Sequence, residues 1–440
     1  MAKLQAYKKY NTIAFDYARE LPYGWQLLPN IAIFQERIER GHENEELLSV
    51  TIGRGVIRQS DLDKKDSSTL DKSKYLLVYP DDIVYSMRFR QGASGYSNYK
   101  GIVSPACTVL RPQKRIKYNP LYFHYMFRTG FYKNYAERYA YGIADGQMPL
   151  RYFDFKRMYS IVPPLEVQNS IVVYLDKKNA QIDKFIRNKE RLIDILEEQK
   201  KTEITRIIVE GVGKQIKLEK TDVPYMPYIN PKSKIKRLKH LASLKGRIGF
   251  HGLKTSDFLN EGPFLITGTD FIEGKINWET CAHISFKRYN EDPYIQLKAG
   301  DFLITKDGTI GKTAIVENIP YEASLNSGVM LVRSLRGDFV NKYLFWIINS
   351  RLFDEFVEIT KTGSTIMHLY QHSFGNFKIP IPLIETQNLI INEIETVVTK
   401  INLAISKARK EISSIKEYRE ALITDLVTGK RSIPQPQTSS

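Results

Sequence analysis

The sequence predicts a mixed α/β (α+β) protein built from two tandem copies of one unit, each unit being a domain followed by a long helix. Three observations support this prediction. The chain contains an internal repeat about half its own length, two long stretches with apolar residues at helical spacing, and short β-prone runs rich in Tyr and Phe before each stretch. Because solenoid units are only roughly 20–50 residues long, the repeat indicates a duplicated module instead.

The repeat is clearest in two proline-led segments. Residues 163–169 (PPLEVQN) are echoed by residues 382–388 (PLIETQN), so Gln168 and Gln387 differ by 387 − 168 = 219 positions. The same offset pairs Ile171 with Ile390, Ile182 with Ile401, Ile186 with Ile405, Leu150 with Leu369, Phe155 with Phe374 and Asp82 with Asp301. A further shift of three pairs Leu110 with Val332 and Phe123 with Phe345.

The stretch after each proline-led segment is predicted to be a long helix with one apolar seam. The seam residues are Leu175, Ile182, Ile186, Ile193 and Leu196 in the first copy, and Ile394, Val398, Ile401, Ile405, Ile412 and Ile415 in the second. Their steps of four and three residues are typical of a coiled coil, with Lys189 and Arg419 as interruptions. The two seams are expected to bury each other; the alternative is two independent helices, each docked on its own domain.

The blocks before the helices, at about 20–160 and 235–378, are predicted to be α/β domains with a mainly antiparallel sheet. The β-prone runs are 75–78, 82–85 and 107–110 in the first block, and 264–267, 301–305, 313–316 and 328–332 in the second. A helix is expected in each block, near 119–138 and 338–359.

These observations give the expected domain boundaries. The segments are an N-terminal arm (1–20), a first domain (21–162), a first long helix (163–213), a connector (214–234), a second domain (235–379), a second long helix (380–430) and a disordered tail (431–440). Gly211 and Gly429 are expected to end the two helices.

The charge balance indicates a polyanionic partner. Lys and Arg number 65 against 49 Asp and Glu, which gives a formal net charge of +16. DNA, RNA and an acidic membrane all fit this charge, and so does a basic surface with no partner. No apolar run approaches the roughly 20 residues of a spanning helix, and the N-terminus lacks the apolar core of a secretory signal. With only Cys107 and Cys281, a disulfide framework is not expected either, so we expect a cytoplasmic protein without a membrane partner.

Basic residues interleaved with glycine and aromatic residues are the candidates for DNA contact. They are Arg54, Arg58, Arg88, Arg90 and Lys100 in the first domain, and Lys245, Arg247, Lys254, Lys306 and Lys312 in the second. Gly308 and Gly311 belong to the second set, because glycine lets backbone N–H groups approach a phosphate closely. The alternative for any single residue is an ordinary solvated side chain.

No constellation in the sequence predicts catalysis. Residues 308–313 (GTIGKT) resemble a phosphate-binding loop, but Lys306 stands where that motif requires a glycine. Residues 119–122 (NPLY) resemble the adenine-gripping element of methyltransferases, but the second proline is missing, and a capped helix start is the alternative. His368 and His372 lack a third ligand. We therefore expect no catalytic residue, no metal site and no bound cofactor.

The domain–helix–domain–helix order resembles the specificity subunit of a type I restriction–modification system. The likeness lies in the two proline-led helix starts, the long helices, residues 21–25 (LPYGW), residues 300–311 and the ending 422–430. The second domain departs from the pattern, because it lacks the Pro-x-Gly-Trp element at its entry.

The resemblance implies two DNA target recognition domains, each reading one half of a bipartite, asymmetric site in double-stranded DNA. The helices would pair as an antiparallel coiled coil with internal pseudo-two-fold symmetry, fix the spacing of the halves and dock two methylation subunits. Restriction and translocation subunits would join this core. The chain would be non-catalytic, with S-adenosylmethionine, ATP and Mg bound in the partner subunits.

Two other classes of function remain open on the sequence alone. One is a coiled-coil nucleic-acid-binding scaffold or RNA adaptor unrelated to restriction, for which the helix seam would suffice. The other is a free-standing methyltransferase or nuclease, which would need a methyl-donor or metal site. Dependence on a methylating partner separates the specificity subunit from the scaffold.

Overall fold

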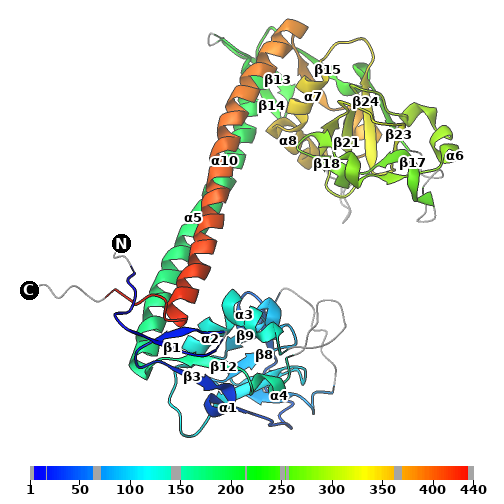
Figure 1. Ribbon diagram of the computed structural model, residues 1–440. Helices are drawn as coiled ribbons and strands as arrows, with labels where there is room; N and C mark the ends of the chain where they lie inside the picture. Colours follow the sequence, from blue (N-terminus) through cyan, green and yellow to red (C-terminus); the bar gives the residue numbers. More distant parts are fainter. Residues whose placement is uncertain are drawn as a thin grey trace, which may run out of the picture. The chain divides into compact units, whose positions relative to one another are not determined.

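A computed structural model describes residues 4–15, 17–62, 71–139, 150–213, 216–247, 253, 257–360 and 369–434. Lys254 and His368, both considered above, lie outside these residues. The chain forms two compact units: unit 1 comprises 1–189 and 410–440, and unit 2 comprises 190–409. The boundary between them falls within the two long helices, so each unit contains one domain and parts of both helices (Figure 1).

Unit 1 contains an antiparallel sheet with the strand order β4-β11-β8-β9, supplemented by two-stranded sheets. Its strands are β1 (Tyr10–Thr12), β2 (Glu20–Pro22), β3 (Gln26–Pro29), β4 (Phe34–Glu36), β5 (Leu48–Thr51), β6 (Gly55–Arg58), β7 (Leu76–Val78), β8 (Ile83–Tyr85), β9 (Ser94–Tyr96), β10 (Gly101–Val103), β11 (Thr108–Pro112) and β12 (Tyr159–Val162). Its helices are α1 (Asn30–Ile33), η1 (Gln59–Asp61), η2 (Phe89–Gln91), α2 (Pro120–Arg128), α3 (Gly130–Glu137), α4 (Tyr152–Phe155) and the start of α5 (Leu165–Glu210).

Unit 2 repeats this plan with the strand order β16-β24-β21-β22. Its strands are β13 (Glu219–Val223), β14 (Met226–Ile229), β15 (Lys234–Arg237), β16 (Ala242–Gly246), β17 (Leu259–Ile266), β18 (Phe271–Ile272), β19 (Lys275–Ile276), β20 (Ala282–His283), β21 (Phe302–Thr305), β22 (Thr313–Ile315), β23 (Ala323–Leu325), β24 (Val329–Ser334) and β25 (Lys378–Ile381). Its helices are η3 (Leu238–His240), η6 (Gly268–Asp270), η7 (Trp278–Thr280), α6 (Phe286–Asn290), η8 (Pro293–Ile295), α7 (Asn341–Ile348), α8 (Arg351–Thr360), α9 (Gln371–Gly375) and the start of α10 (Ile384–Val427). Both sheets are antiparallel, while β17 and β23 pair in parallel in a separate sheet.

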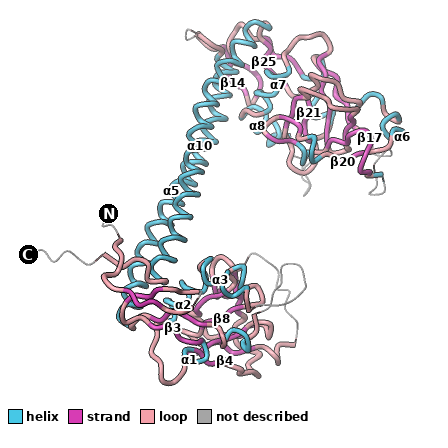
Figure 2. Tube along the Cα trace, in the orientation of Figure 1, coloured by secondary structure: helices cyan, strands magenta, loops and turns pink. Residues whose placement is uncertain are grey.

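The two long helices lie side by side in each unit (Figure 2). The cross-helix polar pairs are, in unit 1, Asp183 with Arg419 and Lys189 with Glu411, and, in unit 2, Glu197 with Arg409 and Lys200 with Asn402. Because residue numbers rise along α5 where they fall along α10, the helices run antiparallel. The predicted fold class is therefore confirmed, and the sequence interruptions Lys189 and Arg419 are the residues that form ion pairs across the helices in unit 1.

The two ends of each long helix pack into the hydrophobic cores of the domains. The unit 1 core contains Leu175 from α5 together with Leu422 and Leu426 from α10. The unit 2 core contains Ile394 and Val398 from α10, together with Ile204, Ile207 and Ile208 from α5. Each domain therefore folds around the start of its own helix and the end of the other one.

A buried glutamine fixes each proline-led helix start, which explains the repeated motif. Gln168 donates to the Pro163 carbonyl at 2.9 Å and accepts from the Asn119 backbone N–H at 2.9 Å. Gln387 donates to the Pro382 carbonyl at 3.0 Å and accepts from the Val340 N–H at 2.9 Å. In each unit the glutamine side chain joins the long helix to the start of the domain helix, α2 or α7.

The structure differs from the predicted elements in two places. The helix expected near 119–138 is broken at Thr129, whose hydroxyl accepts from the Tyr132 N–H at 3.2 Å and caps α3. The helix expected near 338–359 breaks likewise, since the Ser350 hydroxyl accepts from the Leu352 N–H at 3.3 Å. The pairing of Phe123 with Phe345 is wrong by one position, because Tyr122 and Tyr343 make the matching hydroxyl bonds to the Ile161 and Pro380 carbonyls.

The segments expected to flank the domains carry structure of their own. Within the expected connector, β13 and β14 pair, and Val223 and Met226 lie in the unit 2 core. Within the expected N-terminal arm, β1 pairs with β2, and Tyr17 lies in the unit 1 core. In the expected tail, Ser432 donates to the Gln5 carbonyl at 2.7 Å, while residues 435–440 lie outside the described residues. Apolar side chains in each segment provide the reason for this packing.

Candidate nucleic-acid interface

Candidate residues from the two domains lie on equivalent turns of the two units. The turn between β8 and β9 is closed by the Ser86 N–H and the Ala93 carbonyl at 3.1 Å. The turn between β21 and β22 is closed by the Thr305 N–H and the Lys312 carbonyl at 2.8 Å, at the repeat offset of 219. Gly92 and Gly311 occupy matching positions with φ angles of 94° and 85°. A left-handed conformation at the same place in both turns favours glycine.

The unit 2 turn presents glycine and lysine at its tip. Gly308 has a φ of 69° with no atom within 4 Å of the place where a Cβ would stand, so the backbone at the tip is open. Lys312 is exposed, and Lys306 is half-buried beside Gly246 of β16. The Thr305 hydroxyl accepts from the Lys312 N–H at 3.0 Å and holds the turn closed. An anion could therefore approach backbone and lysine together.

The unit 1 turn presents arginines instead. Arg88 and Arg90 are both exposed, and Arg90 forms an ion pair with Glu137 of α3. The two turns thus share their closing hydrogen bond and a left-handed glycine, but between these points unit 1 has the short helix η2 and unit 2 has the left-handed Gly308.

A β-hairpin lies beside each turn. In unit 1 it is formed by β5 and β6 and carries the exposed Arg54 and Arg58. Its Gly55 packs against Gly95 of β9 so closely that a Cβ on Gly95 would stand 2.8 Å from the Gly55 Cα. In unit 2 the β18–β19 hairpin takes the same place, with Gly274 at the repeat offset from Gly55.

Other unit 1 candidates are held in surface ion pairs. Arg58 lies 3.1 Å from Glu46 and 5.0 Å from the Tyr99 ring centroid, and Lys100 pairs with Glu45. Exposed pairs of this kind contribute only about 0–1 kcal/mol, so a phosphate could replace the carboxylate at little cost.

In unit 2, one candidate is exposed and another is buried. Lys245 is exposed, with its ammonium 5.3 Å from the Tyr294 ring centroid. Arg247 is only 2% exposed and donates to the Leu325 carbonyl at 2.9 Å and to the Ser324 hydroxyl at 3.2 Å. Burial lowers the pKa of Arg247. The structure therefore contradicts Arg247 as a direct DNA contact, because its guanidinium is enclosed by the protein.

Arg128, which the sequence did not single out, connects the loops of unit 1. From the last turn of α2 its guanidinium donates to the carbonyls of Ile52 and Gly53 in the hairpin, both at 2.7 Å. It also donates to the Ser94 carbonyl at 2.8 Å and the Gly92 carbonyl at 3.4 Å, at the neighbouring turn. The paired glycines at offset 219 were readable in the sequence and would have indicated these loops.

A cavity of about 500 Å³ lies under these loops in unit 1. It is lined by loop residues such as Gly53 and Gly92 and by helix-pair residues such as Asn179 and Arg419. His124 also lines it and accepts from the Tyr96 N–H at 3.3 Å. Burial, followed by the charge of Arg128, lowers the pKa of His124 to about 3, so this histidine is neutral at physiological pH.

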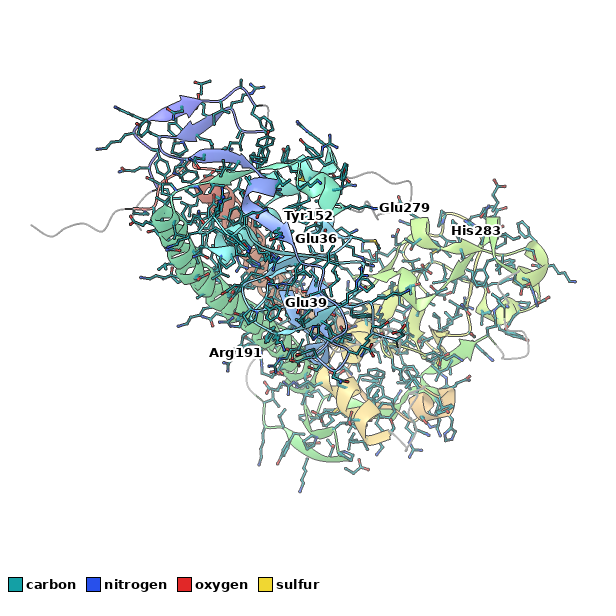
Figure 3. All side chains as sticks on the ribbon, turned by 90° about the horizontal axis from the view of Figure 1, so that it is seen from below. Glu36, Glu39, Tyr152, Arg191, Glu279 and His283 are labelled. Atoms are coloured by element: carbon teal, nitrogen blue, oxygen red, sulfur yellow. The ribbon has the colours of Figure 1, made fainter. Side chains whose placement is uncertain are left out.

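The opposite edge of the unit 1 sheet carries both acidic and basic side chains, and Arg37 forms ion pairs there with Glu39 and Asp82. Figure 3 labels Glu36, on the edge strand β4, with Glu39 and Tyr152 in the same unit. Burial raises the pKa of Glu36 and of Tyr152, whose hydroxyl donates to the Phe34 carbonyl at 3.1 Å.

The structure decides between alternatives at two motifs, the phosphate-binding-loop resemblance at residues 308–313 and the methyltransferase resemblance at residues 119–122. Residues 313–315 form strand β22, whereas a phosphate-binding loop would continue into a helix. Asn119 caps α2 by accepting from the Leu121 N–H at 3.0 Å, as the helix-start alternative predicted. Within the part of the chain that the structure describes, no three His, Cys, Asp or Glu residues group as metal ligands. Among the same residues, no helix combines the length and apolarity needed to cross a membrane.

The fold and its basic loops define a class of protein: duplicated α/β domains joined by an antiparallel pair of long helices. A family model described as the type I restriction modification DNA specificity domain matches residues 197–413. The type I restriction enzyme MjaVIII specificity subunit of Methanocaldococcus jannaschii is 23% identical over 81% of each chain. The MjaX specificity subunit of the same organism, assigned by its name to a type I restriction enzyme, is 22% identical over 97% of this chain and 98% of its own.

A solved structure has the same fold. A chain from work on complex assembly and conformational transition of the type I restriction–modification system has a TM-score of 0.68 and 14% identity, covering 92% of this chain and 98% of its own. The chain therefore carries a type I restriction modification DNA specificity domain, and over most of its length it is similar to type I restriction enzyme specificity subunits.

Proposed function

We propose that the two domains are target recognition domains, each reading one half of a bipartite, asymmetric site in double-stranded DNA. The first spans about 21–162 and the second about 235–379. The DNA-contacting residues are Arg54, Arg58, Arg88, Arg90 and Lys100 in the first domain and Lys245, Lys306, Gly308, Gly311 and Lys312 in the second. Lys254 remains in the second set as a proposal from the sequence.

The observation that carries this proposal is the pair of equivalent turns. A duplex offers the same phosphate geometry to each domain, so turns that share their closing hydrogen bond and a left-handed glycine suit contact with the DNA backbone. The side chains at the tips differ: Arg88 and Arg90 in one unit, Lys306 and Lys312 in the other. Arginine pairs bidentately with guanine, whereas lysine offers a compact charge, so two different half-sites are expected.

The helix pair is proposed to fix the spacing of the half-sites and to dock two methylation subunits. The seam residues Ile182, Ile186, Ile401 and Ile405 are buried, and the cross-helix ion pairs favour a single register. An antiparallel pair with an internal repeat offers two similar surfaces, and two copies of one partner suit such surfaces. Restriction and translocation subunits would join this core.

The chain is proposed to act without chemistry of its own, in the cytoplasm. Adenine methylation requires a methyl donor and a pocket for an extruded base, and DNA translocation requires ATP and Mg. In this proposal S-adenosylmethionine, ATP and Mg bind to the partner subunits. The chain contributes recognition of the DNA sequence and assembly of the complex.

A genome-wide map of adenine methylation, made with and without this gene, tests the proposed function. We expect an asymmetric two-part motif with a fixed gap to disappear when the gene is deleted and to return when it is restored. Unchanged methylation in a host with active methylation subunits would contradict the proposal. Binding of the chain to RNA in preference to duplex DNA would then favour the scaffold alternative.

A further inference from the structure

Arg128 holds two separate loops of unit 1 with one planar group. Its guanidinium donates to two carbonyls at the β5–β6 hairpin tip and to two at the β8–β9 turn, at 2.7–3.4 Å. All four acceptors are neutral backbone oxygens, and Arg128 itself is half-buried. A fork of several donors in one plane is what allows arginine, unlike lysine, to reach several fixed acceptors at once.

The residues next to these carbonyls are proposed DNA contacts. Arg54 follows Gly53 in the hairpin, and Arg88 and Arg90 precede Gly92 in the turn. Beneath the loops lies the cavity of about 500 Å³ described above, so side-chain packing does not fill the space under them. The hydrogen bonds of Arg128, together with the close packing of Gly55 against Gly95, therefore fix the distance between Arg54 and the two turn arginines.

At the equivalent place in unit 2, a shorter side chain forms the hydrogen bond between the domain helix and the sheet. Asn349, at the end of α7, donates to the Thr313 hydroxyl at 2.9 Å. Thr313 is related to Ser94 by the repeat offset of 219, and Asn349 to Arg128 by 221, the offset that relates Tyr122 to Tyr343. The asparagine side chain bonds to strand β22, while the longer arginine of unit 1 reaches both strand β9 and the hairpin.

We propose that Arg128 is a positioning residue that sets base discrimination in the half-site read by unit 1. It does so by fixing the hairpin with Arg54 and the turn with Arg88 and Arg90 in one arrangement. The inference rests on the proposed function. It adds that a residue with no DNA contact of its own determines specificity in one half-site only.

The test is the methylation map of a host that expresses the variants Arg128→Ala, Arg128→Lys or Asn349→Ala with the methylation subunits. Both Arg128 variants should relax the same half of the motif. Methylation at sites with a wrong base in that half should rise at least about tenfold relative to wild type. The other half should keep its wild-type base frequencies. Asn349→Ala should leave the half affected by Arg128 unchanged.

Arg128→Lys distinguishes positioning from direct contact with phosphate. A lysine keeps the positive charge but has a single ammonium, which cannot span carbonyls on two loops. If Arg128→Lys discriminates bases as the wild type does, while Arg128→Ala does not, charge alone suffices and the proposal is wrong. Wild-type discrimination in both variants would also overturn it.

Gly95→Ala provides a second route that does not alter charge. The new Cβ would stand 2.8 Å from the Gly55 Cα, so the hairpin must shift away from β9. We expect relaxation of the same half-site as with Arg128→Ala.

Thermal unfolding of each purified complex controls for stability. If discrimination falls equally in both halves and follows the unfolding temperature, Arg128 only stabilises the fold and the inference fails. Absence of any bipartite motif in the wild type would instead refute the proposed function.

Discussion

At the scale of single residues, the accessibility of a basic side chain decides whether it can contact DNA. Lys312 is exposed at a glycine-containing turn, whereas Arg247 is enclosed and bonded to protein oxygens. A buried basic residue such as Arg247 therefore stabilises the fold, whereas an exposed one such as Lys312 is accessible for DNA recognition. Two substitutions separate these roles.

Lys312→Ala should weaken DNA binding without changing stability. Removing one phosphate contact lowers the salt dependence, so the slope of log affinity against log salt should become about 1 less steep. The free energy of unfolding should stay within about 0.5 kcal/mol of wild type, because the side chain is exposed. Affinity measured at several salt concentrations checks the first expectation and chemical denaturation the second. An unchanged slope would remove Lys312 from the proposed contacts.

Arg247→Ala should show the opposite behaviour. The substitution leaves the Leu325 carbonyl without this donor and opens a cavity in unit 2, which should cost about 2–4 kcal/mol of stability. The salt slope of DNA binding by the remaining folded protein should equal that of wild type. A lower slope with intact stability would restore Arg247 as a phosphate contact.

The sequence could not predict which basic side chains are accessible for contact with DNA. The strand β16 ends at Gly246, so its alternation does not fix the direction of Arg247. The partners of Arg58, Arg90 and Lys100 are carboxylates on other elements, and only the tertiary fold brings them near. Arg128 gave no signal, because its acceptors are backbone carbonyls and their identity leaves no trace in the sequence.

At the scale of elements, the proline-led motif has a structural explanation in its glutamine. Gln168 is 1% exposed and Gln387 is fully buried, while Glu166 and Glu385 of the same motif are exposed. The repeated glutamine therefore fixes the junction between long helix and domain helix, and the repeated glutamate does not.

Gln168→Leu should destabilise unit 1 by about 2–4 kcal/mol, because the Pro163 carbonyl and the Asn119 N–H lose their partner. Gln387→Leu should have a similar effect on unit 2. Glu166→Gln is the matched control and should change stability by about 1 kcal/mol or less, since it alters only a charge in the first turn of α5. Differential scanning calorimetry of the three variants measures the changes. Equal effects from the glutamine and glutamate variants would contradict this account of the motif.

Ile401→Asp combined with Ile405→Asp should separate the helix pair. Both isoleucines are buried, and an unpaired carboxylate in such a seam costs several kcal/mol. Assembly with methylation subunits should be lost in size-exclusion chromatography. Leu403→Asp, on the exposed face of the same helix, should leave the helix pair intact. If the double variant still assembles, the helix pair is not the docking element.

The long helices were predictable because their apolar period extends over many turns. The breaks at Thr129 and Ser350 were not, since Thr and Ser favour helix caps but also occur inside helices, so their presence alone does not end a helix. The burial of seam residues also varies: Ile182 and Ile405 are buried, whereas Ile193 and Ile412 are half-buried. Periodicity gives the face of a helix but not how deeply a neighbour covers it.

At the scale of the whole molecule, the duplication is the feature that the sequence conveyed best. Matching offsets predicted two units of one fold, and matching hydrogen bonds at Gln168 and Gln387 confirm that the copies share internal architecture. The paired turns extend the duplication to the proposed interface. The central claim is therefore that two related domains read two different half-sites at a fixed gap.

The most direct measurement is the affinity of the assembled methylation complex for four duplexes at one salt concentration. One duplex carries the intact motif, two carry one scrambled half each, and the fourth has a gap longer by one base pair. We expect each of the last three to bind at least about tenfold more weakly than the first. Equal binding to the intact and lengthened gaps would contradict a fixed spacing. Equal binding to an intact and a scrambled half would contradict recognition by two domains.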